Sequence, residues 1–283
     1  MSGPIVAGVD GSGSAAAAVE WAAEEAVRRG VPLRVVHVRE PWAGEDEPHL
    51  DAPDGEHHED VLTEAAEAAR KRAPGLEVTT ALLTGTVVAS LRAESETAAL
   101  VVIGSRGMGG FAELLLGSVG MGLAGHARGP VVVVRETGGE RRGEIVAGYD
   151  GSPHAEAALR FALEQAARHG ARLRVVYAWP APPPAPYGLS YGDLVQAAFD
   201  AEANRVRERV AAWREEYPGV DVRDEVVVGH PVPALTEASE QADLVVVGSR
   251  GKGPLASLLG SVSHGVLHHA HCPVAVVRPP EQS

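Results

Sequence analysis

The chain contains two copies of one sequence unit, and this repeat constrains the fold more than any other feature. Residues 5–38, IVAGVDGSGSAAAAVEWAAEEAVRRGVPLRVVHV, align without gaps to residues 145–178, and 19 of the 34 positions are identical. Residues 127–135 match residues 270–278 in the same way. A repeat of this length indicates that one structural unit was built twice.

The length of the chain agrees with two domains. A chain of 283 residues is typical of about two domains. We predict one domain over residues 1–138 and a second over residues 143–283. The segment TGGERRG (137–143) is rich in glycine and charge, which is typical of a short linker.

Within each copy, short apolar segments alternate with longer helix-like segments. We predict strands at 5–9, 33–38, 78–83, 100–103 and 131–134, with counterparts at 173–178, 225–228 and 274–277. We predict helices at 14–29, 56–72 and 118–127, with counterparts at 193–216 and 261–270. Alternation of this kind predicts an α/β fold, with a parallel sheet covered by helices on both faces. The irregular segments 40–55 and 179–192 are long enough to be lids or partner surfaces.

Local signals fix some of the boundaries. In the second copy Ser152 suits a helix N-cap, Pro153 suits the first helical turn, and Gly170 suits the C-terminal stop. The final strands, VVVV and VAVV, are β-branched and apolar, and an edge strand of that kind tends to pair. We therefore expect the two copies to pair through their last strands and the whole chain to form a homodimer.

Composition excludes several classes of protein. The single cysteine, Cys272, excludes an internal disulfide framework, and we expect a small buried side chain there. No apolar run approaches the roughly 20 residues that cross a bilayer. The chain starts directly with a strand and shows no signal peptide, so we expect a cytoplasmic protein without a membrane partner.

The net charge of −13 is mostly local. Residues 40–60 hold nine acidic side chains and no Lys or Arg, which leaves −4 for the rest of the chain. We interpret this segment as a solvated excursion. No basic face is evident, and we therefore expect no nucleic-acid partner.

A glycine-rich stretch follows the fourth predicted strand of each copy. LVVIGSRGMGGFAELLLGSVG (100–120) recurs as LVVVGSRGKGPLASLLGSVS (244–263). Glycine lets a ligand approach the backbone closely, and the N–H groups of such a loop and of the following helix form a ready phosphate site. A single glycine loop is weak evidence, but here the strand, the GSRG and the GSV all repeat.

An aspartate ends the first strand of each copy. In doubly wound sheets, ligands bind beyond the carboxyl ends of strands, where the strand order reverses. If the first and fourth strands are neighbours there, Asp10 and Asp150 face the glycine loops. Such a carboxylate can accept hydrogen bonds from two ribose hydroxyls, or it can cap the following helix, and both roles can coexist. Val38 and Ala178, which end the second strands, are placed to offer backbone groups to a base.

The spacing G-x2-G-x9-G-S (Gly104, Gly107, Gly117, Ser118), with the aspartate after the first strand, resembles the universal stress protein family in its ATP-binding branch. The resemblance covers nearly the whole chain, twice. It implies two tandem Rossmann-like (adenine nucleotide α hydrolase-like) domains, each a five-stranded parallel sheet. It also implies pairing of the domains through their last strands, and ATP, with or without Mg, as the ligand.

Carried over by position, the resemblance implies an ATP site in each copy and no catalytic or metal-ligating residue. In the first copy the implied site residues are Val9, Asp10, Val38, Gly104, Arg106, Gly107, Gly117, Ser118 and Val119. In the second copy they are Asp150, Ala178, Gly248, Arg250, Gly251, Gly260, Ser261, Val262 and Ser263.

The second copy departs from this pattern. Eight residues separate Gly251 from Gly260, where the first copy has nine, and Pro254 stiffens the shortened loop. In the first copy Gly120 stands where Ser263 offers a hydroxyl. We expect the loop change to outweigh the hydroxyl, so that the first site binds ATP more tightly.

Other motifs are weak or missing. The sequence has no G-x4-G-K-[ST] phosphate loop and no G-x-S-x-G nucleophile elbow. His264 and His268 are four residues apart, but no cysteine or carboxylate completes a metal shell near them, so we favour surface or interface histidines. The favoured function is an ATP-binding stress sensor or regulator, in which any hydrolysis is slow. A nucleotide-independent scaffold and a nucleotide-processing enzyme such as a slow ATPase are the alternatives.

Overall fold

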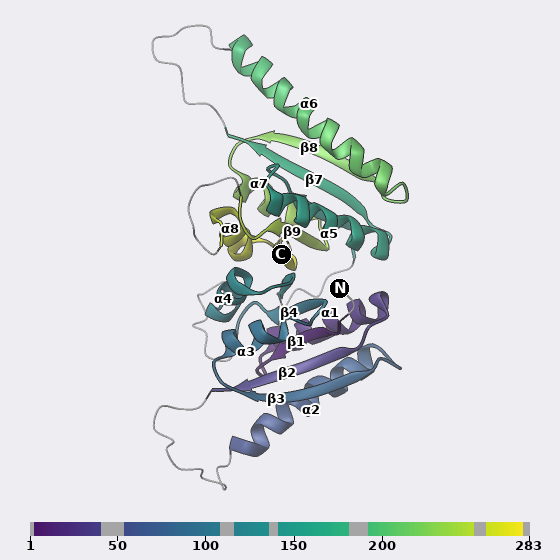
Figure 1. Ribbon diagram of the computed structural model, residues 1–283, viewed down its shortest axis with the longest axis vertical. Helices are drawn as coiled ribbons and strands as arrows, with labels where there is room; N and C mark the ends of the chain where they lie inside the picture. Colours follow the sequence, from purple (N-terminus) through teal and green to yellow (C-terminus); the bar gives the residue numbers. More distant parts are fainter. Residues whose placement is uncertain are drawn as a thin grey trace.

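The computed structural model describes residues 3–40, 54–107, 116–135, 141–180, 192–251 and 259–279. One ten-stranded sheet runs through both halves in the order β3-β2-β1-β4-β5-β10-β9-β6-β7-β8. The molecule is elongated, with helices α2 and α6 at its opposite ends (Figure 1). The predicted alternation of strands and helices is confirmed.

Nine elements lie in the described residues of the first half. They are β1 (Ile5–Val9), α1 (Gly13–Arg29), β2 (Leu33–Arg39), α2 (Asp54–Arg72), β3 (Val78–Thr84), α3 (Val87–Glu94), β4 (Leu100–Gly104), α4 (Ser118–His126) and β5 (Val131–Val134).

The second half repeats them in the same order. They are β6 (Glu144–Gly148), α5 (Pro153–His169), β7 (Arg172–Trp179), α6 (Gly192–Glu216), β8 (Val222–Val228), α7 (Pro231–Ser239), β9 (Leu244–Gly248), α8 (Ser261–His269) and β10 (Val274–Val277).

Within each half every strand pair is parallel, and the strand order reverses between the first and fourth strands. β1 lies between β2 and β4, with Gly8 opposite Val36 on one side and Ile103 on the other. β6 lies between β7 and β9 in the same way. The carboxyl ends of β1 and β4 are therefore adjacent, as the sequence predicts.

The two halves join through their last strands. β5 and β10 pair antiparallel, with Val133 opposite Val274 and Val131 opposite Val276. The expected pairing within the chain is thus confirmed, and it merges two five-stranded sheets into one.

A pair of arginines strengthens this junction. Arg135, just after β5, donates to the carbonyl oxygens of Leu267 and His268 at 2.6 and 2.8 Å. Arg278, just after β10, donates to the carbonyl oxygen of Gly125. Each guanidinium thus meets the C-terminal end of the other half's last helix, where the helix dipole favours a cation. Burial is the main reason why the pKa of Arg135 is lowered.

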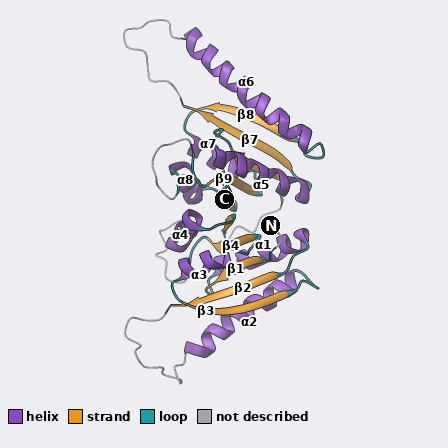
Figure 2. Ribbon diagram, in the orientation of Figure 1, coloured by secondary structure: helices purple, strands orange, loops and turns teal. Residues whose placement is uncertain are grey.

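Helices cover both faces of the sheet (Figure 2), and the sheet separates two apolar cores. One core packs strands against α1, α2, α5 and α6, and the other packs them against α3, α4, α7 and α8. Alanine lines much of α1, including the fully buried Ala18, Ala22 and Ala26, so the helix packs closely on the sheet. Cys272 is buried and unpaired, as expected.

The predicted caps of α5 are observed, and α1 has equivalent ones. Ser12 and Ser152 are the N-caps of α1 and α5, and their side chains accept hydrogen bonds from the N–H groups three residues on. Gly30 and Gly170 end these helices with φ of 64° and 61°, a left-handed conformation that glycine adopts without strain.

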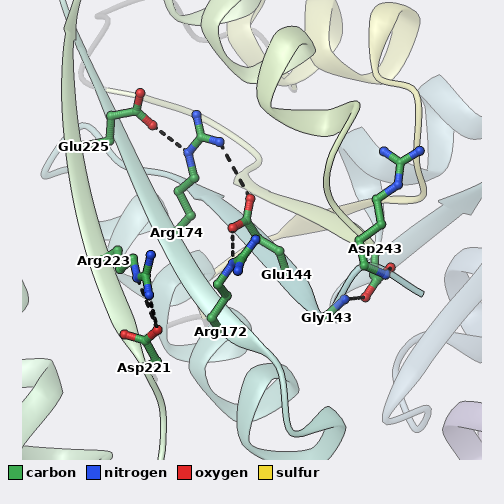
Figure 3. Close-up of polar contacts among 9 residues, drawn as sticks. Gly143, Glu144, Arg172, Arg174, Asp221, Arg223, Glu225 and Asp243 are labelled. Atoms are coloured by element: carbon green, nitrogen blue, oxygen red, sulfur yellow. Dashed lines mark hydrogen bonds and ion pairs between the residues drawn. The ribbon is translucent and has the colours of Figure 1, made fainter. Parts of the chain in front are cut away.

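The edge strand β8 starts three residues earlier than predicted, at Val222 instead of residue 225. Two of the three missed residues are charged and have paired side chains: Arg223 with Asp221, and Asp224 with Arg214. Glu225 follows in the same way, bonding Arg174, which also lies near Glu144 (Figure 3). An apolar pattern cannot reveal a strand whose side chains are stabilised by ion pairs along an exposed edge.

Candidate functional site

A cavity of about 530 Å³ lies beyond the carboxyl ends of β1, β2 and β4, and a second of about 430 Å³ lies at the equivalent place in the other half. Both volumes are in the range of small-ligand sites. The first cavity is lined by all nine predicted residues of its half: Val9, Asp10, Val38, Gly104, Arg106, Gly107, Gly117, Ser118 and Val119. The second is lined by all nine of its own: Asp150, Ala178, Gly248, Arg250, Gly251, Gly260, Ser261, Val262 and Ser263.

The aspartate carboxylate faces the glycine loop in each cavity. A Cβ placed on Gly107 would lie 2.5 Å from Asp10 Oδ2, and one on Gly251 would lie 2.6 Å from Asp150 Oδ2. Only glycine at these positions leaves the carboxylate where it is. The expected juxtaposition of aspartate and loop is therefore present twice.

The other carboxylate oxygen organises the first turn of the next helix. Asp10 Oδ1 accepts hydrogen bonds from the N–H of Ser12 at 3.1 Å and from its hydroxyl at 2.6 Å. Asp150 Oδ1 accepts from the N–H of Ser152 at 2.9 Å. Each aspartate thus positions the N-cap serine with one oxygen, while its second oxygen faces the glycine loop.

The N-termini of α4 and α8 face the cavities without a side-chain cap. The N-caps are Gly117 and Gly260, and neither helix start receives a side-chain hydrogen bond from the described residues. The helices α1 and α5 differ, because serines cap them. Uncapped N–H groups at a helix N-terminus favour an anion.

The glycine loops return to the same anchor in both halves. The N–H of Gly117 donates to the carbonyl of Ser105 at 2.8 Å, and that of Gly260 donates to the carbonyl of Ser249 at 2.8 Å. The missing residue of the second loop therefore leaves this anchor in place. Residues 108–115 and 252–258, including Pro254, lie outside the described part of the chain.

Two predicted site residues have structural contacts of their own. A Cβ on Gly104 would lie 2.7 Å from the carbonyl carbon of Ser14, so this glycine allows α1 to approach β4. Ser263 is 2% exposed and donates its hydroxyl to the carbonyl of Gly248 at 2.6 Å. That proton is engaged by the backbone carbonyl, so the hydroxyl can take part in further hydrogen bonds only as an acceptor.

The two predicted arginines are held differently. The main chain of Arg106 is fixed by α1, because Ser14 Oγ donates to its carbonyl. Ser14 Oγ also accepts from the N–H of Arg106 at 3.3 Å. Arg250 Nε is buried and has no hydrogen-bond partner among the described residues. This orphaned donor on the cavity wall suits an anionic ligand.

The sequence also matches a known protein family. A sequence model of the universal stress protein family matches the chain twice, over residues 1–135 and 142–278. The chain belongs to the universal stress protein family. The double match confirms the tandem arrangement.

Tandem relatives cover nearly the whole chain. A universal stress protein of Mycobacterium tuberculosis (strain ATCC 25618 / H37Rv) is 36% identical over 302 residues, covering 98% of this chain and 95% of the relative. One of Mycolicibacterium smegmatis is 37% identical over 297 residues, covering 97% of each. The crystal structure of a universal stress protein from Archaeoglobus fulgidus shares the fold, with a TM-score of 0.74, 23% identity, and coverage of 100% of this chain and 98% of that one.

The universal stress protein resemblance did not point to three cavity-lining side chains. His37 Nδ1 donates to the carbonyl of Val9 at 2.7 Å, and His37 is buried, with 8% of its surface exposed. Tyr177 takes the place of His37 in the second half, and Tyr149 takes the place of Val9. Burial is the main cause that raises the pKa of both tyrosines, followed by hydrogen bonds to Glu202 and Glu156. The signal was available, since these positions differ between two otherwise similar strands.

The C-terminal histidines show no metal cluster. The rings of His264 and His268 lie 4.6 Å apart, and burial, together with the neighbouring His264, His269 and Arg135, lowers the pKa of His268. No group of three or more His, Cys, Asp or Glu side chains able to hold a metal occurs in the described ranges. Within those ranges there is also no helix long and apolar enough to cross a membrane.

Proposed function

We propose that each half of this universal stress protein binds an adenine nucleotide, ATP in the first instance, and that the protein acts as a nucleotide-dependent regulator of a stress response. The observation that carries the proposal is the opposition of Asp10 and Asp150 to glycine loops that lead into uncapped helix N-termini. One end of each cavity suits a hydroxylated sugar, and the other suits a phosphate chain.

The energetics require contacts to the whole nucleotide. A helix N-terminus contributes about 0.3–2 kcal/mol toward an anion, whereas micromolar binding needs about 8 kcal/mol. Hydrogen bonds to a charged group contribute about 1.5–3 kcal/mol each, so two ribose hydroxyls on Asp10 supply a substantial share. The backbone at Val38 and Ala178 is assigned to the base, and the loop residues from Gly104 to Val119 and from Gly248 to Ser263 to the phosphates.

The remaining assignments are part of the same proposal. The functional domains are residues 1–138 and 143–283, the protein is cytoplasmic, and the whole chain forms a homodimer. Mg accompanies the phosphates where it is bound, and hydrolysis is slow. A light-scattering mass at micromolar concentration tests the dimer, and a monomer mass would exclude it.

Native mass spectrometry of the purified protein, followed by a turnover assay, tests the function. We expect co-purified adenine nucleotide at one or two per chain and negligible release of phosphate from added ATP. Rapid turnover would favour a nucleotide-processing enzyme. Absence of nucleotide, with no binding of added ATP, would favour a scaffold that works without nucleotide.

A further inference from the structure

In each half, one side chain ties the cavity wall to the outer helix. His37 precedes Val38 at the end of β2, and its Nε2 lies 2.8 Å from His58 Nδ1 on α2. Tyr177 precedes Ala178 at the end of β7, and its hydroxyl donates to Glu202 Oε1 on α6 at 2.7 Å. Both His37 and Tyr177 line their cavities.

These ties occupy equivalent positions of the repeat. Pro74-Gly75 after α2 aligns with Pro218-Gly219 after α6, and this alignment places His58 opposite Glu202. The same alignment pairs Arg70 with Arg214, and each donates to the first carbonyl of the following strand, Val78 or Val222. The second half is therefore an internal control for the first.

The histidine tie limits the number of protons that it can hold. The carbonyl of Val9 only accepts hydrogen bonds, so His37 Nδ1 carries a hydrogen. At 2.8 Å, one hydrogen lies between His37 Nε2 and His58 Nδ1. The bridged pair can therefore be neutral or carry one positive charge. A second charge puts a hydrogen on both facing nitrogens, which breaks the bridge.

The tyrosine tie has no such limit in the same pH range. A tyrosine hydroxyl donating to a carboxylate changes only when the carboxylate gains a proton, which for an ordinary glutamate occurs near pH 4.3. Arg205 also bonds Glu202, at 2.6 Å, which favours the charged carboxylate. This tie is therefore unchanged between about pH 5.5 and about pH 8.

Other charged groups near the histidine pair are few in the described structure. Asp10, Glu40 and Arg106 line the same cavity, and His57 on α2 lies with its ring 6.0 Å from that of His58. Asp10 and Glu40 bring negative charge to this region, and Arg106 brings positive charge. The limit of one bridging hydrogen does not depend on their balance.

The tie bears directly on the binding wall. His37 holds the carbonyl of Val9, the residue before Asp10, and its ring fills the wall between β1 and α2. When His58 is released, His37 loses the contact that fixes its ring plane. The end of β1 that presents Asp10 is then less well fixed.

We propose that His37 is a positioning residue of the first cavity and that its bridge to His58 makes nucleotide binding there proton-linked, whereas the second cavity, tied by Tyr177 and Glu202, lacks this linkage. This inference rests on the proposed nucleotide function. It assigns the two halves different responses to acidification, with affinity falling more at the first cavity than at the second.

The test compares the two cavities in single-site variants. ATP is titrated by calorimetry into Asp150→Ala, which reports the first cavity, and into Asp10→Ala, which reports the second. Between about pH 7.5 and about pH 5.8, the affinity of the first cavity for ATP should fall more than that of the second. Protonation of ATP itself affects both cavities and cancels in the ratio of their affinities.

A transplant within the repeat provides the matched control. In the Asp150→Ala background, His37→Tyr with His58→Glu installs the tie of the second half, and the pH ratio of the first cavity should fall to that of the second. In the Asp10→Ala background, Tyr177→His with Glu202→His should raise the ratio of the second cavity. Equal pH responses of both cavities, or a ratio unmoved by the transplant, would overturn the inference.

A ligand-free measurement separates failure of the inference from failure of the function. Amide hydrogen exchange of α2, corrected for intrinsic rates, should lose protection between about pH 7.5 and about pH 5.8, while α6 does not. No ATP binding at the higher pH would overturn the nucleotide function even if α2 responds. Retained α2 protection at the lower pH would overturn the proton-dependent bridge even if ATP binds.

Discussion

Asp10 and Gly107 approach each other so closely that the carboxylate occupies the space a side chain at position 107 would need. The distance from an added Cβ to Asp10 Oδ2 is 2.5 Å, and the pair Asp150 and Gly251 repeats it at 2.6 Å. The two elements come from strands far apart in the sequence, β1 and β4, which the parallel pairing places side by side. Glycine at position 107 thus leaves room for this carboxylate at the cavity wall.

Replacing this glycine should weaken binding without unfolding the protein. In Gly107→Ala the new methyl group displaces the Asp10 carboxylate, and loss of one charged hydrogen bond of about 1.5–3 kcal/mol reduces ATP affinity in the first cavity about tenfold or more. The melting temperature should change little, because the displaced group is the end of a side chain. Calorimetry and thermal unfolding measure the two effects.

Gly219→Ala is the matched control for this substitution. A Cβ at position 219 meets nothing within 4 Å. Its affinity for ATP should equal that of the wild type. If Gly107→Ala binds ATP as tightly as Gly219→Ala, the position of the Asp10 carboxylate is not important for binding.

Arg135→Ala should destabilise the junction between the halves. The guanidinium makes two hydrogen bonds to carbonyls of α8, at 2.6 and 2.8 Å, and such charged bonds contribute about 1.5–3 kcal/mol each. We expect a loss of about 2 kcal/mol or more in the free energy of unfolding, measured with urea. Arg223→Ala serves as the control, because its exposed pair with Asp221 should contribute less than about 1 kcal/mol. Equal losses in the two variants would contradict a stabilising role of Arg135 at the junction between the halves.

We expect the free energy of unfolding to fall in acid because of Glu25. This fully buried carboxylate accepts from Arg29 Nε at 2.5 Å and from His169 Nε2, in the other half, at 2.9 Å. Burial alone would raise the pKa of Glu25, but the hydrogen bonds and charges of His169 and Arg29 outweigh it and lower the pKa below 4.5. A lowered carboxylate pKa gives stability that is present above pH 4.5 and lost as the pH falls through the folded pKa.

Glu25→Gln measures this contribution. The substitution installs the residue found at the equivalent position 165. At neutral pH we expect a loss of about 3–5 kcal/mol, as for removal of one partner of a buried ion pair. The difference between variant and wild type should stay constant down to about pH 5 and shrink below about pH 4. A difference that instead grows on acidification would contradict a lowered pKa of Glu25 in the folded protein.

Most of the fold could be predicted from the sequence, because the same pattern of apolar residues occurs in both copies of the repeat. The last strands at 131–134 and 274–277 match the structure residue for residue. The start of β8 was missed because Arg223 and Asp224 make ion pairs along an exposed edge, which interrupt the apolar pattern. Such partners, including Arg214, are brought in by tertiary structure and leave no local pattern.

The cavity-lining backbone was also predictable, whereas its supporting side chains were not. Glycine spacing and the strand-ending aspartates located the Asp10–Gly107 contact. The His37–His58 bridge was missed, since one member lies within an apolar strand and the other in an acidic helix. Ser263 lines the second cavity as predicted, but nothing in the sequence indicated that its hydroxyl donates to the carbonyl of Gly248.

The most direct test of the account is a calorimetric titration of ATP into the wild type, Asp10→Ala, Asp150→Ala and the double variant. We predict two sites in the wild type, loss of more than about tenfold in affinity at the altered site of each single variant, and no measurable binding in the double variant. We also predict tighter binding at the first site, so that Asp10→Ala loses more of the total affinity than Asp150→Ala. A double variant that binds ATP as the wild type does would contradict the central claim that these two carboxylates hold the nucleotide.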